Sequence, residues 1–495
     1  MRKQSGQSTK RDRKNRQKQS KPNRKKLSQP KQAISLASKL RLIFPDHSIF
    51  GSLGLHGNTK WLPSQLVILT LVWAMAGNRF VTDAFANSAS ACQVMFGNLP
   101  VTTYQGMMNA LVHWTDSLMP VVFAQLQRSM RIMGGTYYCI CGFVPIAFDG
   151  SRATVPRTAA NEKAFCAQNY GNGSYAKATK RKGTKVKRKS LGTAHPQEPQ
   201  IWITMLWHMG LRLPFCWKLG RSDSSERKHV TELLDEQEFP ENTLFCGDAG
   251  FVGYQFWQQI LDHGYDFMVR VGANVSLLAD NCEYELQANG NVYCWPKEMR
   301  SKGKPIRLRL VQVKIGKANV WLLTSVLSEK QLSTAQMIAF YKMRWGIEVE
   351  FRGLKQTLDN AKMCCLNPSR SLVELHWSIA AMAVSELLAI REQLRAHDCR
   401  RGKSKSSWTP QRRSLAQTMR AIRQAINKPN DRPSLGKDLT TMLEQALTDS
   451  YKRHGSKKAR HLPRPNKKAL KQPKVTVLTG KERSRIREIE SKTAA

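Results

Sequence analysis

Three carboxylates in the sequence stand where chemistry is possible. Asp149 and Asp248 each follow an apolar run, and a glycine comes directly after Asp149 in IAFDG and two residues after Asp248 in LFCGDAG. Open α/β sheets bind ligands at the carboxyl ends of strands, although an Asp before Gly is also typical of a simple turn. With Glu348, the two aspartates would form a cluster that repels itself unless a cation is bound. Oxygen ligands of this kind suit Mg²⁺ or Mn²⁺, and two such ions support phosphodiester displacement.

The residues around Glu348 form a charged stripe on a helix predicted over about 333–357. At about 100° per residue, one narrow sector holds a phenol, an acid and three cations, and a separate sector is apolar. The stripe comprises Tyr341, Arg344, Glu348, Arg352 and Lys355, and the apolar face comprises Met343, Ile347, Phe351 and Leu354. Ion pairs between residues four apart on a solvated helix would explain the same pattern. The stripe therefore favours a phosphate-binding surface only when it is combined with the two upstream aspartates.

The spacing Tyr341-x2-Arg344-x3-Glu348-x6-Lys355 resembles the YREK signature of DDE-type insertion-sequence transposases, in the insertion-sequence-four family. In that resemblance Asp149 and Asp248 correspond to the first two catalytic acids and Glu348 to the third. The likeness spans about 144–358, which is less than half of the chain.

The resemblance implies a ribonuclease-H-like catalytic core that cleaves transposon ends and transfers strands to target DNA, through hairpin ends, with two Mg²⁺ or Mn²⁺ ions. It implies double-stranded DNA partners (terminal inverted repeats and target), a homodimer in the synaptic complex, and the cytoplasm of a bacterium, at the nucleoid when DNA is bound. Tyr341, Arg344 and Lys355 would bind DNA phosphates, and the helical stripe alone adds Arg352. Trp321 would stack on a flipped base, with core packing or Trp295 as the alternatives.

The surrounding elements predict an α/β fold with an inserted antiparallel β subdomain, an N-terminal helical domain and a C-terminal helical and basic region. Apolar residues recur every three or four positions in the first part, strand-like runs follow from 136, and SRATVP (151–156) could return as a second strand. The predicted organisation is a disordered basic tail 1–32, a helical and possibly DNA-binding domain 33–135, a catalytic core 136–272 and 326–370 with a basic loop 171–198, a β insertion 273–325, a helix 371–398, and a basic, largely flexible tail 399–495.

Positive charge is concentrated in three segments of a chain with a net charge of +43. Residues 1–32 carry a net +12, residues 177–189 carry +8 and residues 391–495 carry +19. Such segments suit a polyanion such as nucleic acid, which binds with strong salt dependence, although solvated tails have the same composition.

Other classes of protein fit the sequence less well. The longest apolar runs, Leu66–Met75 and Ile379–Val384, are shorter than the roughly 20 residues of a bilayer helix, so we expect no membrane partner. The 11 cysteines show neither a disulfide framework nor zinc-site spacing. Two alternatives to a transposase remain open, namely a non-catalytic basic nucleic-acid-binding protein and a metal-dependent nuclease without strand transfer.

Overall fold

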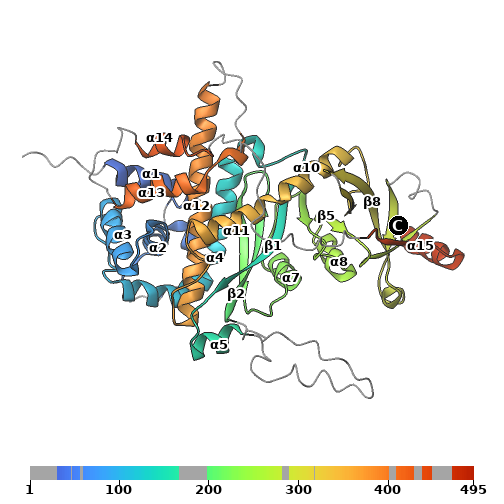
Figure 1. The fold of residues 1–495 in the computed structure, drawn as a ribbon, viewed down its shortest axis with the longest axis horizontal. Helices are drawn as coiled ribbons and strands as arrows, with labels where there is room; N and C mark the ends of the chain where they lie inside the picture. The colour runs from blue at the N-terminus through green and yellow to red at the C-terminus, as the bar shows by residue number, and fades with distance from the viewer. Residues whose placement is uncertain are drawn as a thin grey trace, which may run out of the picture.

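The computed structural model describes residues 31–45, 47–55, 59–166, 198–280, 289–316, 318–400, 409–427, 438–448 and 471–494. The predicted basic tail 1–32 and basic loop 171–198 lie almost wholly outside these ranges. The described chain is a mixed α/β protein in which a ten-stranded sheet runs from a group of helices to a smaller β-rich end (Figure 1).

The sheet has the strand order β10-β6-β7-β8-β9-β5-β4-β1-β2-β3. Its strands are β1 Val144–Thr154, β2 Gln200–His208, β3 Leu213–Gly220, β4 Thr243–Gly247, β5 Asp266–Val271, β6 Ser276–Ala279, β7 Asn289–Cys294, β8 Ile306–Ile315, β9 Ala318–Thr324 and β10 Lys474–Val477. Strands β1, β4 and β5 are parallel, whereas β2 and β3 continue the sheet antiparallel on the far side of β1. The parallel strands are almost continuously apolar because helices cover them.

Strand β1 corrects one expectation. Residues 151–156 do not return as a second strand, because β1 runs straight through to Thr154. Asp149 and Gly150 stay extended and pair with Met205 and Thr204 of β2, so the Asp-Gly pair forms no turn here.

The segment predicted as a β insertion, 273–325, extends the main sheet. Strands β6 to β9 pair antiparallel with one another, and β9 pairs antiparallel with β5. Strand β10, from near the end of the chain, adds to β6 in parallel.

The helices fall into two groups. One lies around the parallel strands, and the other lies at the end of the molecule that is away from the β-rich end (Figure 1). Around the sheet lie α5 Ala159–Phe165, α7 Glu226–Glu236, α8 Tyr254–Asp262, α10 Thr334–Arg344 and α11 Gly346–Gln356. The other group consists of α1 Lys31–Ile43, α2 Pro63–Ala76, α3 Val81–Phe96, α4 Tyr104–Met133, α12 Pro368–Arg400, α13 Leu415–Asn427 and α14 Leu439–Glu444. Helix α15, Gly480–Ala494, lies against the β-rich end.

Helix α12 holds the second group together. It packs against α2, α4, α13, α14 and strand β3, and a buried ion pair joins Lys39 of α1 to Glu392 at 2.7 Å. By length and composition this helix could cross a membrane, but 89% of its apolar window is buried inside the protein. The same test is met by the core helices of water-soluble proteins, which is the role that α12 has in this fold.

The expectation of a largely flexible tail over 399–495 is wrong for the described residues. Helices α13 and α14 bury Met419, Ile422 and Leu443 completely, and β10 with α15 docks on the insertion through Leu478 and Ile486. The basic composition hid an amphipathic pattern, in which apolar residues three and four apart face the core.

The helix predicted over 333–357 is two helices. Helix α10 begins at a capping box formed by Ser333 and Gln336 and ends at Arg344, and α11 begins at Gly346. Trp345 stands between them, with half of its surface exposed.

Candidate active site at the ends of strands β1 and β4

Asp149 and Asp248 lie side by side because their strands are parallel neighbours. The last residues paired between β1 and β4 are Ala147 and Cys246. Asp149 is two residues beyond the first of these and Asp248 two residues beyond the second, so both stand at the same level. This level is the carboxyl end of β4, where open α/β sheets bind their ligands.

Backbone amides hold both carboxylates. The Gly150 N–H donates to Asp149 Oδ1 at 2.9 Å, and the Gly250 N–H donates to Asp248 Oδ1 at 2.7 Å. The glycines that suggested simple turns therefore orient the acids. Among the residues that the structure describes, the second oxygen of neither carboxylate accepts a hydrogen bond.

An aromatic layer supports the two aspartates. The Phe148 ring packs against Phe251 and Phe256, with centroids 4.2 and 5.9 Å away. Gly247 leaves room for this ring, because a Cβ there would lie 2.5 Å from the Phe148 ring. The residues just before the two aspartates thus fix the spacing of their strands.

Glu348 reaches the same site from α11. Its side chain is exposed, and its negative charge acts on the carboxyl group of Asp149. Burial raises the pKa of Asp149 to about 6; the Gly150 hydrogen bond and Arg344 lower it, and Asp248 and Glu348 raise it further. The structure therefore brings the three predicted acids into one electrostatic neighbourhood.

Arg344 is the cation of this site. Its side chain is 4% exposed, its guanidinium lies over the rings of Tyr341 and Trp345 at 5.6 and 5.5 Å, and it acts on Asp149. Its Nε has no hydrogen-bond partner among the described residues. A buried, incompletely bonded guanidinium beside carboxylates is suited to an anionic group.

The other predicted DNA contacts differ in exposure. Tyr341 is 4% exposed under Arg344, Lys355 is half-buried with its pKa lowered by burial, and Arg352 is exposed. Arg352 lines a separate hollow with Glu350 and Arg413, so the predicted stripe does not point to a single place. Trp321 is half-buried on β9, where it pairs with Val271 and Gln312. Their roles in DNA binding stay predictions.

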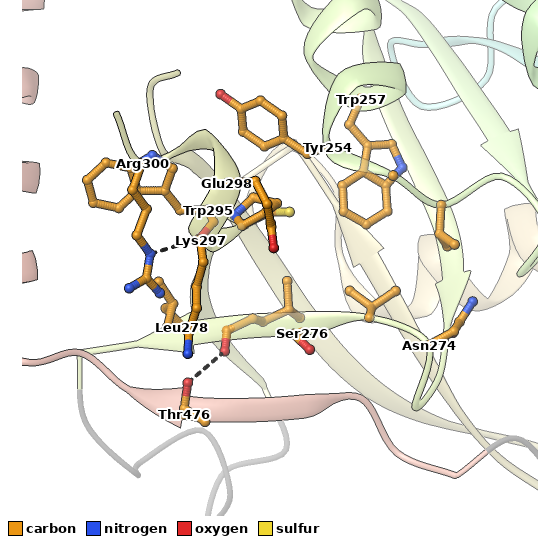
Figure 2. Close-up of a pocket in the computed structure, with 16 residues that line it drawn as sticks. Tyr254, Trp257, Asn274, Ser276, Leu278, Trp295, Lys297, Glu298, Arg300 and Thr476 are labelled. Atoms are coloured by element: carbon orange, nitrogen blue, oxygen red, sulfur yellow. Dashed lines mark hydrogen bonds between the residues drawn. The ribbon is translucent and has the colours of Figure 1, made fainter. Parts of the chain in front are cut away.

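A second cavity, of about 520 Å³, lies in the β-rich end (Figure 2). Lys297, Glu298 and Arg300 face β6 and Thr476 of β10 across it. Trp295, the alternative stacking residue, is 2% exposed and its Nε1 donates to the Gly303 carbonyl at 2.9 Å. This tryptophan belongs to the core in the structure.

Sequence reasoning missed a fourth acid, Glu226, in the first turn of α7. Burial raises its pKa to about 7; the charges of Asp149 and Asp248 add to the rise, and Arg152 opposes it. An acid in the first turn of a helix is ordinarily a partner for the helix dipole, so the sequence carried no separate signal.

The donor set fits a hard divalent cation, because every candidate ligand is a carboxylate oxygen. Among the described residues, however, no three Asp, Glu, His or Cys side chains are already gathered around one point. The acids interact electrostatically, and a bound cation would have to draw their side chains together.

Comparison with known proteins bears on this site. Residues 144–384 match the family model described as the transposase DDE domain. Over these residues, just under half of the chain, the protein is similar to a transposase DDE domain. All three predicted acids, Glu226 and the Tyr341–Lys355 signature lie inside the matched segment.

Two further comparisons complete the picture. No curated protein matches the chain. Among solved structures, the chain is similar to the piggyBac transposase in a synaptic complex with hairpin DNA, at 11% identity and a TM-score of 0.38, covering 86% of this chain and 87% of that chain.

Proposed function

We propose that this transposase cleaves the ends of a mobile DNA element and transfers the freed strands into target DNA. The observation that carries the proposal is the meeting of Asp149, Asp248 and Glu348 inside the DDE domain. Double-stranded DNA is the substrate that suits the basic segments of the chain, since its phosphates bind cations without sequence preference.

In this proposal Asp149, Asp248 and Glu348 hold two Mg²⁺ or Mn²⁺ ions. When bound, such ions lower the pKa of an attacking hydroxyl and stabilise the charge of the leaving oxygen. The Gly150 and Gly250 amides keep the two aspartates oriented for this task. Arg344, buried beside Asp149, would bind a phosphate oxygen next to the bond that breaks.

The remaining contacts are proposed from position and chemistry. Exposed Arg352 and half-buried Lys355 on α11 would bind the DNA backbone beyond the reacting phosphate. Tyr341 would act by holding Arg344 in place beneath it. Trp321, partly exposed on β9, would stack on a base flipped out at a hairpin end.

We also propose that the catalytic core is ribonuclease-H-like and belongs to the insertion-sequence-four family with the YREK signature. The supporting features are the order β3-β2-β1-β4-β5, the parallel β1, β4 and β5, and strands inserted before the helix of Glu348. We propose further that the protein acts as a homodimer on paired transposon ends, in the cytoplasm of a bacterium.

The test uses the full-length protein and a labelled duplex that carries the inverted repeats bordering the gene. Wild type is compared with Glu348→Gln in Mg²⁺ and in EDTA. The control is Glu236→Gln on α7, which removes an exposed carboxylate that forms an ion pair with Lys218 of β3. We expect wild type and the control to show Mg²⁺-dependent nicking and to form joined or hairpin products. The Glu348→Gln variant should show neither the nicking nor the products.

The other outcomes separate the alternatives. Metal-dependent cleavage that never gives joined or hairpin products would identify a nuclease. Binding of the ends with no strand chemistry in either metal would leave a nucleic-acid-binding protein and overturn the proposal.

A further inference from the structure

We propose that Glu226 is a fourth carboxylate of the cation site in the DDE domain, beside Asp149 and Asp248. This inference deepens the proposed function and rests on it for the identity of the site. The signature of the family names three acids, and Glu226 lies outside it.

The first observation is a close contact between Glu226 and the backbone next to Asp149. A Cβ added at Gly150 would overlap the Glu226 carboxyl group, so this carboxylate occupies the space that a side chain at 150 would fill. Gly150 is also the residue whose amide holds Asp149. Glu226 therefore turns toward the strand that carries the first catalytic acid, although residues at a helix start can point into solvent.

Helix α7 holds Glu226 in this place. Val230, Leu233 and Leu234 are buried on one side of the helix, and His229 Nδ1 lies 2.9 Å from the Thr204 hydroxyl of β2. The residue is thus presented by a packed element, as a binding group requires.

The second observation is the division of the acids into two overlapping sets. Glu348 acts on Asp149, and Glu226 feels the charges of Asp149 and Asp248. The two aspartates form the shared middle of the site, and the two glutamates reach it from different helices. This arrangement provides ligands for two cation positions that share an aspartate.

The third observation is the shortage of positive charge. Within the described residues Glu226 forms no ion pair, and the cation acting on it, Arg152, has its guanidinium over the Trp202 ring at 4.3 Å. Arg344, nine-tenths buried with an unbonded Nε, is the cation acting on Asp149. Four carboxylates face two guanidinium groups, and burial raises the pKa of both Asp149 and Glu226, so a divalent cation would stabilise their charged forms.

The experiment measures binding of Mn²⁺ itself, by electron paramagnetic resonance on the full-length protein without DNA. Glu226→Gln removes the charge and keeps the shape. The matched control is Glu232→Gln, on the same helix, where the carboxylate pairs with Lys218 at 2.9 Å. We expect Glu226→Gln to weaken Mn²⁺ binding about tenfold or more, because losing even a group that only supports a ligand weakens metal binding by that factor. The control should bind Mn²⁺ like wild type.

A second variant leaves Glu226 intact. Gly150→Ala places a methyl group where the Glu226 carboxyl lies and should weaken Mn²⁺ binding to a similar extent. In the Glu226→Ala background the same methyl should have little further effect, because the space is then empty. The two routes keep the test decisive if one variant folds poorly.

The outcomes separate this inference from the proposed function. Wild-type Mn²⁺ affinity in both Glu226→Gln and Gly150→Ala overturns the inference, as does a wild type that binds no Mn²⁺ at millimolar concentration. If Mn²⁺ binding falls as expected but wild type neither cleaves nor joins DNA, the fourth carboxylate stands and the proposed function fails.

Discussion

Two carboxylates of α11, only two residues apart, have opposite surroundings. Glu348 is exposed near the carboxyl end of β4, and Glu350 is 6% exposed against Glu386 of α12. Burial raises the pKa of Glu350 well above its usual range, and the neighbouring Glu386 carboxylate adds to the effect. One helix thus contributes an acid to each of two clusters.

The two clusters differ in what neutralises them. Around Glu386, Arg413 donates to its carboxylate at 3.0 Å, to the Leu211 carbonyl at 2.8 Å and to the Arg212 carbonyl. Arg413 therefore neutralises this cluster from within the protein, although Glu386 Oε2 and Glu350 Oε1 have no hydrogen-bond partner among the described residues. The cluster at Asp149 has amides on one oxygen of each aspartate and a buried arginine with a free Nε.

The largest expected effect comes from a substitution in the acid cluster at Asp149. Asp149→Asn should reduce end cleavage in Mg²⁺ by on the order of 1,000-fold, since a bound metal supplies several kcal/mol to the transition state. Duplex binding should persist, and the variant should be at least as stable as wild type. Cleavage rates on the labelled end measure the loss, and activity within tenfold of wild type would remove Asp149 from the catalytic groups.

A substitution in the acid cluster around Glu386 should lower the stability of the protein. Glu386→Ala leaves the Arg413 guanidinium buried without its carboxylate, which should lower the free energy of unfolding by about 3 kcal/mol or more. Glu350→Gln is the matched control, because a carboxyl group that burial keeps protonated can be replaced by an amide with little change. Chemical denaturation measures both. Equal losses in the two variants would contradict the charge assignment.

A smaller effect tests the support beneath the aspartates. Gly247→Ala should push the Phe148 ring and lower the free energy of unfolding by about 1–3 kcal/mol, the usual range for overpacking. Gly54→Ala, where a Cβ would meet nothing within 4 Å, serves as the control. If denaturation midpoints of the two variants coincide, the aromatic layer does not set the strand spacing.

The smallest effect depends on pH. In the folded protein burial raises the pKa of Asp149 to about 6, above its ordinary value of 3.8, so the charged form of Asp149 destabilises the folded protein above about pH 6. Asp149→Asn should therefore melt at a higher temperature than wild type at pH 7–8. The gap should shrink as the pH falls below about 6 and close near pH 3, where Asp149 is protonated in both the folded and the unfolded wild type. A gap that widens on acidification would mean a lowered pKa.

The sequence singled out the three acids because each lies in a short local pattern. Asp149 and Asp248 each follow an apolar run, with a glycine one and two residues later, and Glu348 lies within a spacing of four signature residues. Such local patterns can be recognised in the sequence without knowing the fold. Arg352 lies one turn beyond Glu348 on α11 and lines another hollow, and a helical wheel could not show this because it gives the direction of a residue but not its position along the axis.

Contacts between distant segments were beyond prediction. Glu226 precedes Asp248 by 22 residues and follows Asp149 by 77, and a glutamate at a helix start has an ordinary explanation. The Glu350, Glu386 and Arg413 cluster joins α11, α12 and the connection that precedes α13, and no spacing rule links these residues. The burial of α13 and the presence of α14 were missed because basic residues dominate the composition of 399–495.

Strand β10 has a consequence for truncated products. It covers the outer edge of β6, and Leu478 and Ile486 close an apolar patch formed by Leu278, Tyr293 and Trp295. A product that stops before residue 471 would leave the backbone N–H and C=O groups of that edge unpaired beside exposed aromatic rings. Unprotected edges template pairing with other chains, so such a fragment would aggregate or capture the matching strand of an intact copy.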